Sequence, residues 1–124
     1  MPNLRILTNV PKNQIPEDFC NKIIPVLVRT VRKSAEKFSC VICGDCQVGF
    51  GGDNTAPGAV ATLESIGHVG PEENKLVVKE LSAFMQKEIG VNPDRFFISY
   101  YDMKGYNIGK GGITLEYLQP AEKK

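Results

Sequence analysis

The chain has 124 residues, of which 42% are apolar and 23% charged, and its formal net charge is +1. This length suits a single domain (1–124) whose core needs no metal or disulfide. The near-neutral charge argues against nucleic acid and against a membrane surface as partners, and no apolar stretch reaches the roughly 18 residues of a membrane-spanning helix. The N-terminus also lacks the pattern of a signal peptide.

The first elements expected are a strand and a helix. Residues 4–8 are largely apolar and are followed by Asn9 and Pro11, as at the end of a strand. Pro16 and the two acidic residues after it are a typical helix start, and an apolar stripe at steps of four runs on to Val31. Pro25 lies inside this stripe, where it removes a backbone hydrogen bond at a cost of about 3 kcal/mol, so we expect a bend there.

The remaining chain repeats this pattern. Pro71 and two following glutamates again predict a helix start, and Gly90 ends the second apolar stripe. Composition and alternation predict the other segments: strands at 38–48, 59–66, 95–103 and 113–118, a loop at 50–58, a glycine-rich turn at 109–112 and a frayed tail at 121–124.

The order strand, helix, strand therefore occurs twice, as a tandem βαβ pseudo-repeat. We expect an α+β fold in which a four-stranded mixed sheet carries both helices on one face. Residues 38–48 and 95–101 are apolar on both faces of their strands, so the other face of the sheet also needs a cover. No third layer remains in the chain, and we therefore predict a symmetric oligomer of identical copies.

Three of the four cysteines, Cys40, Cys43 and Cys46, stand at intervals of three residues. Cys-x-x-Cys spacing is found in redox and zinc sites, but a zinc site needs four ligands and only Cys20 and His68 remain. On a strand, Cys40 and Cys43 point to opposite faces. We favour free thiols and no metal site, and we expect His68, next to a turn, to be a solvated surface residue.

Several short blocks occur in the same order and at the same separations as in one known family. They are MP at the start, TNVP at 8–11, FGG at 50–52, SIG at 65–67, PDR at 93–95 and YYDM at 100–103. With these blocks, residues 1 to about 117 resemble the macrophage migration inhibitory factor and D-dopachrome tautomerase family of the tautomerase superfamily. The segment IGKGG at 108–112 is more similar to the D-dopachrome tautomerase branch.

The resemblance implies a homotrimer with active sites between neighbouring subunits. It implies an isomerase without a cofactor, a keto–enol tautomerase that acts on small aromatic keto acids such as phenylpyruvate and on L-dopachrome-type substrates. It also implies a cytokine role through the class II invariant chain, and a cytoplasmic protein that is secreted without a signal peptide. The alternative is a secreted immune-modulating ligand of the invariant chain whose tautomerase pocket is weak or vestigial.

Pro2 is the catalytic residue that the resemblance implies, as a base freed by removal of Met1. Pro2 cannot donate to a sheet ladder, so without the resemblance it would simply be the first residue of a strand. An α-amine titrates at about 7.7–8.0, and burial in an apolar pocket lowers that pKa because it disfavours the charged form. A neutral secondary amine can then remove the acidic proton next to a carbonyl group.

The resemblance assigns substrate binding to further residues. Lys33 would bind the substrate carboxylate and lower the proline pKa, although a lysine at a helix end is also favoured by the helix dipole alone. Ser65 and Ile66 belong to the SIG block, and the resemblance implies that the Ile66 N–H meets the substrate. In the alternative interpretation, this block is simply the end of a strand at a turn.

A second group of implied pocket residues comes from the last third of the chain. Phe97 and Ser99, contributed by the neighbouring subunit, stand where the first branch of the family has tyrosine and asparagine. Ile108 matches an apolar position that lines the pocket in the family, although from the sequence alone it could equally be a core residue. Lys110 would add positive charge at the pocket mouth.

Overall fold

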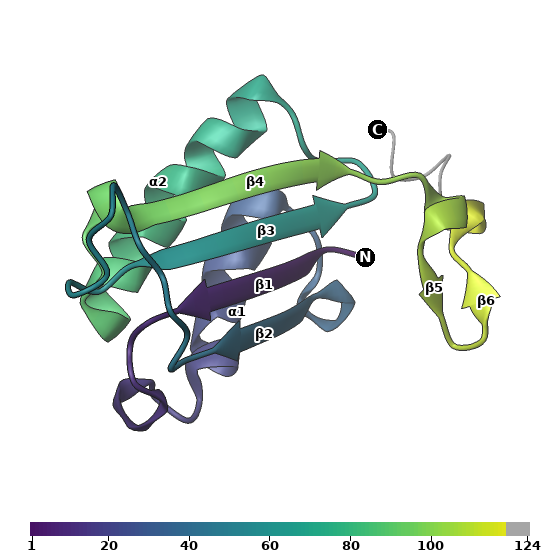
Figure 1. The fold of residues 1–124 in the computed structure, drawn as a ribbon. Helices are drawn as coiled ribbons and strands as arrows, with labels where there is room; N and C mark the ends of the chain where they lie inside the picture. Colours follow the sequence, from purple (N-terminus) through teal and green to yellow (C-terminus); the bar gives the residue numbers. More distant parts are fainter. Residues whose placement is uncertain (119–124) are drawn as a thin grey trace.

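The computed structural model describes residues 1–118, so the tail predicted at 121–124 lies outside the described residues (Figure 1). Two α-helices, a four-stranded sheet, a two-stranded sheet and several short 3-10 helices make up this part of the chain. The helices are α1 (Phe19–Val31) and α2 (Pro71–Ile89). The strands are β1 (Asn3–Thr8), β2 (Ser39–Cys43), β3 (Ala59–Ser65), β4 (Phe96–Asp102), β5 (Gly109–Lys110) and β6 (Ile113–Thr114).

The main sheet has the strand order β2-β1-β3-β4 and is mixed, as predicted. Each βαβ unit supplies one parallel pair, β1 with β2 and β3 with β4, and the two units meet through the antiparallel pair of β1 and β3. Both helices lie on one face of this sheet (Figure 1). They contact each other through an edge-to-face pair of Phe19 and Phe84, whose ring centroids are 5.3 Å apart.

The other face of the sheet is open in the single chain. Residues of β1 and β3 alternate between the buried helix side and this open side. Four large apolar side chains on the open side stay between 37% and 56% exposed: Leu7, Val41, Val60 and Phe97. This matches the expected bare face. Among residues 1–118, no helix combines the length and the hydropathy that a membrane crossing requires.

The helix ends follow the local sequence closely. α1 begins at Phe19, after a turn in which the Phe19 N–H donates to the Pro16 carbonyl at 3.0 Å, and it keeps Pro25 inside. It ends where Arg32 adopts a left-handed backbone with φ 63°. α2 spans Pro71–Ile89, and Gly90 stops it with φ 72°, a conformation that glycine adopts without strain.

Two of the expected strands were predicted too long. β2 ends at Cys43, because Asp45 has a positive φ of 60° and the chain bends there. The Asp45 N–H donates to the Val10 carbonyl at 3.0 Å, which holds the bend against the end of β1. The strand predicted at 113–118 is also wrong, since β6 covers only Ile113–Thr114 and a 3-10 helix (Glu116–Leu118) follows.

Gly44 is expected to tolerate no side chain. A Cβ at this position would lie 2.7 Å from the Val10 carbonyl oxygen and 2.8 Å from Ile15 Cδ1. Gly44→Ala should therefore lower the free energy of unfolding by about 1–3 kcal/mol, measured by urea denaturation. Gly49→Ala is the matched control, because its nearest neighbour would be Asp53 O at 3.8 Å. Equal denaturation midpoints for the two variants would contradict this expectation.

Candidate active site

Pro2 and Ser65 lie opposite each other at one end of the sheet. The antiparallel register pairs Asn3 with Glu64, so Pro2 faces Ser65 one position further on. Both residues are buried. The Pro2 carbonyl accepts a hydrogen bond from the Ser39 N–H at 3.0 Å, which fixes the chain ahead of β1 against β2. The N-terminus and the end of β3 thus lie side by side at one end of the sheet, on its two central strands (Figure 1).

Lys33 enters the same end of the sheet from α1. Its side chain is buried, with 7% of the residue exposed, and Nζ donates a hydrogen bond to the Ile66 carbonyl at 2.9 Å. The left-handed Arg32 ends the helix just before Lys33 and turns the chain. The predicted site residues Lys33, Ser65 and Ile66 therefore lie at the same end of the sheet as Pro2. The Lys33 side chain brings a buried ammonium group to this end.

The turn after β3 is held by contacts that sequence reasoning missed. His68 Nδ1 lies 2.8 Å from the Val31 carbonyl oxygen, and His68 is half-buried, so the expectation of a solvated His68 is wrong. The Gly67 N–H donates to Asp102 Oδ1 at 3.0 Å. These bonds tie the turn to the end of α1 and to the end of β4. Asp102 belongs to the YYDM block, which was the available signal for it.

Ser65 Oγ has an unusual position in this cluster. Ser65 is 0% exposed, so its hydroxyl is fully buried. Within residues 1–118, the structure gives this hydroxyl no hydrogen-bond partner. Leaving such a group unpaired typically costs about 1–3 kcal/mol. The Lys33 ammonium, which donates to the Ile66 carbonyl, is not among the hydrogen-bond partners of this hydroxyl.

Phe97 and Ser99 lie on β4, away from this cluster within one chain. Phe97 pairs with Val60, near the start of β3, and Ser99 pairs with Thr62, at its middle. Ile108 is half-buried and Lys110 exposed. Both belong to the segment of the β5–β6 hairpin, which projects beyond the sheet (Figure 1). A single chain therefore brings Pro2, Lys33, Ser65 and Ile66 to one end of the sheet and leaves Phe97 and Ser99 apart from them.

Comparison with known proteins identifies the family of this chain. The sequence profile of the family described as Macrophage migration inhibitory factor (MIF) matches residues 1–116. The chain belongs to this family. It is 33% identical over 114 residues to Macrophage migration inhibitory factor of Mus musculus, with 92% of this chain and 98% of that protein covered. The protein of the same name from Xenopus laevis is 34% identical over the same length and coverage.

Solved structures of MIF proteins share the fold. The structure of the factor from Trichinella spiralis matches with a TM-score of 0.86 and 26% identity, and it covers 91% of this chain and 99% of that one. The factor from Oncomelania hupensis matches with a TM-score of 0.88 at 21% identity, over 98% of this chain and 88% of that one. The MIF resemblance and the predicted α+β fold are thereby confirmed.

The cysteines of this MIF-family chain are free thiols in the structure. Cys40 is half-buried and Cys43 is exposed. The two are three residues apart on β2, so they point to opposite sides of the sheet, as predicted. Residues 1–118 contain no group of three or more histidine, cysteine or acidic side chains placed to hold a metal. Cys20 Sγ lies 3.5 Å from the Cys40 carbonyl oxygen.

Cys40 should be the less reactive thiol of this strand. Burial raises its pKa to about 12, and the neighbouring Cys20 adds to the shift. Because the thiolate is the nucleophile, a thiol whose pKa lies far above the working pH reacts slowly. In dissociated subunits, whose open sheet face is uncovered, we expect iodoacetamide at pH 8 to modify Cys40 at least about tenfold more slowly than the exposed Cys43. Timed alkylation with peptide mass mapping measures both rates in one sample, and equal rates would contradict the expectation.

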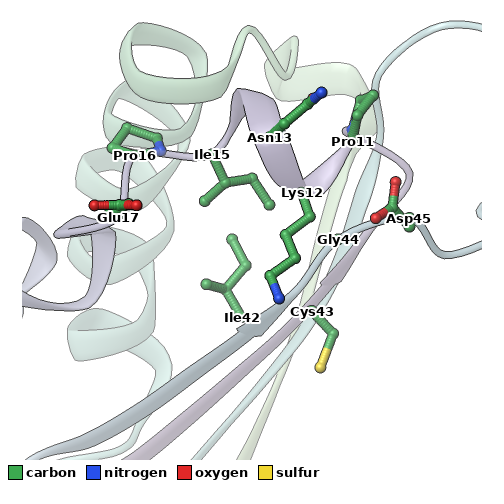
Figure 2. A pocket seen from close by; sticks show the side chains of 10 residues that line it. All are labelled: Pro11, Lys12, Asn13, Ile15, Pro16, Glu17, Ile42, Cys43, Gly44 and Asp45. Carbon is green, nitrogen blue, oxygen red and sulfur yellow. The ribbon is translucent and has the colours of Figure 1, made fainter.

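A surface cavity of about 890 Å³ lies at the opposite end of β1 and β2 from Pro2. Figure 2 shows the Lys12 side chain extending over the end of β2, with Ile15 and Ile42 close by. Glu17 and Asp45 also line this cavity. None of the predicted site residues does, so the cavity is separate from the candidate site.

Proposed function

We propose that this protein is a keto–enol tautomerase, an isomerase of the phenylpyruvate and L-dopachrome type, with Pro2 as its base and no cofactor. The observation that supports this most is the buried Pro2 at one end of the sheet, opposite Ser65, with the Lys33–Ile66 contact at the same end. In the full chain the Pro2 nitrogen is an amide, because it is bonded to Met1. The proposal therefore requires that Met1 is removed.

The chemistry of the free Pro2 nitrogen follows from its surroundings. Burial disfavours the charged form of an amine, so the pKa of this nitrogen should lie below that of an exposed terminal amine. The neutral nitrogen takes the proton from the carbon next to the substrate carbonyl and returns it to another atom, which completes the isomerisation. The Lys33 ammonium pairs with the substrate carboxylate, and the Ile66 N–H adds a backbone donor.

The proposed active assembly is a homotrimer. In one chain Phe97 and Ser99 lie on β4, which β3 separates from β1 and Pro2, and a neighbouring copy would bring Phe97 and Ser99 to it. The open sheet face with its exposed apolar side chains is the surface available for such contacts. Phe97 lacks a phenolic hydroxyl and Ser99 is shorter than an amide side chain. One lost hydrogen bond costs about 0.5–1.5 kcal/mol, so we expect an altered substrate preference.

The test uses purified full-length protein. Intact mass shows whether Met1 is removed, light scattering gives the oligomeric state, and the absorbance of the enol of phenylpyruvate follows the reaction. The proposal expects a trimer without Met1 that accelerates the isomerisation. A chain that keeps Met1, a monomer in solution, or a processed trimer without activity on phenylpyruvate and dopachrome ester would contradict it.

A cytokine-like role is the second candidate function. Relatives from mouse and frog carry the name Macrophage migration inhibitory factor, and Phe97 and Ser99 depart from the residues expected in a tautomerase pocket. In this alternative the protein leaves the cytoplasm without a signal peptide and binds the class II invariant chain, while its pocket is vestigial. Surface plasmon resonance with the invariant-chain ectodomain tests it: binding by a protein without tautomerase activity favours this alternative, and absence of binding contradicts it.

A further inference from the structure

We propose that Ser65 positions the proton on Pro2, by accepting a hydrogen bond at Oγ from the protonated imino group. This inference rests on the proposed function, because it needs the free nitrogen that removal of Met1 creates. It changes the expectation for Ser65 from a residue that touches substrate to one that acts through the base.

The first argument is the burial of Ser65. At 0% exposure its hydroxyl is poorly placed to meet a substrate that arrives from solvent. A buried hydroxyl usually has a partner, and the exceptions in native structures call for an explanation. Among residues 1–118 the structure gives Ser65 Oγ none. The Pro2 nitrogen in its peptide bond to Met1 carries no hydrogen and cannot supply one.

The second argument is the register of the sheet. Leu4 and Leu63 are a directly opposed pair, and both are buried on the helix side. Side chains two residues along a strand return to the same face, so Pro2 and Ser65 also point to the helix side. Opposed residues in an antiparallel pair have Cβ atoms about 4.5–5.5 Å apart. The Ser65 hydroxyl is therefore within reach of the atoms of Pro2.

The chemistry of the reaction decides which group donates and which accepts in this hydrogen bond. Once Met1 is removed, the Pro2 nitrogen becomes a secondary amine, and after it takes a proton from substrate carbon it carries two N–H donors. One donor is needed to return the proton to the product, and the other can bond to Ser65 Oγ. A hydrogen bond from a charged donor is stronger than one from a neutral donor. Ser65 therefore stabilises the protonated state and raises the pKa of Pro2 relative to the same pocket without a hydroxyl.

The test is an NMR titration of Pro2 in the processed protein. Protein labelled with ¹⁵N-proline, with Met1 removal verified by intact mass, is titrated as wild type, Ser65→Ala and Ser65→Cys. Both variants should lower the pKa of the Pro2 nitrogen by about one unit, because the charged form loses its acceptor. The kcat for phenylpyruvate should fall roughly tenfold with little change in KM. Ser82→Ala, on α2, is the control and should leave the pKa unchanged.

The titration reads Pro2 directly and needs no turnover. An unchanged or raised Pro2 pKa in both Ser65 variants overturns the inference, whether or not the enzyme is active. A lowered pKa in Ser65→Ala alone, with Ser65→Cys at the wild-type value, would point to packing and also overturns it. An inactive wild type whose Pro2 pKa still falls in both variants refutes the proposed function and supports the contact.

Discussion

Replacing Pro2 with glycine should lower kcat/KM for phenylpyruvate tautomerisation by about 10²–10⁴-fold, the range that a positioned general base contributes. Glycine leaves a primary amine on a residue with free backbone rotation, so the base loses both its fixed direction and its buried ring. The comparison is made by steady-state kinetics on processed protein of confirmed mass, with circular dichroism to show that the fold is retained.

Two controls isolate the nitrogen from the rest of the site. Pro57→Gly changes an exposed loop proline and should keep the wild-type rate. The wild-type chain with Met1 retained has every side chain in place but an amide at Pro2, and it should be as inactive as Pro2→Gly. Full activity in either Pro2→Gly or the Met1-retained chain would show that another group is the base.

The helices and the mixed sheet could be predicted because their signals are local. Pro71 and Gly90 bracket α2, and the apolar stripe between them has helical spacing throughout. The ends of β2 and β6 could not be predicted, because contacts distant in sequence decide them. Gly44 packs against Val10, and the Leu115 N–H donates to the Gly105 carbonyl at 3.1 Å, which turns the chain after β6.

In the candidate site, too, the residues could be predicted from the sequence but the contacts between them could not. Short motifs marked Pro2, Ser65 and Ile66, and an ungapped count from the TNVP block marked Lys33. No pattern in the sequence shows that Lys33 Nζ bonds to the Ile66 carbonyl or that Ser65 faces Pro2. These relations arise from the antiparallel register of β1 and β3, which joins the two βαβ units. A lone histidine beside a turn likewise gives no sign that its ring reaches the end of α1.

Lys33→Met should raise the KM for phenylpyruvate by about 10–100-fold, the equivalent of one lost hydrogen bond to a charged group. Methionine keeps the length of the side chain and suits the buried position, where lysine is 7% exposed. The Ile66 carbonyl loses its donor, so the free energy of unfolding should also fall by about 1–3 kcal/mol. Steady-state kinetics and urea denaturation on the same samples measure the two effects.

The choice of substrate separates charge pairing from damage to the fold. A keto ester such as a dopachrome methyl ester has no carboxylate for Lys33, so its KM should change far less than that of phenylpyruvate. Lys79→Met removes an exposed lysine on α2 and should change neither KM. If Lys33→Met weakens acid and ester equally, the ammonium does not pair with the substrate carboxylate, and its contact with Ile66 serves only to hold the end of α1 on the turn after β3.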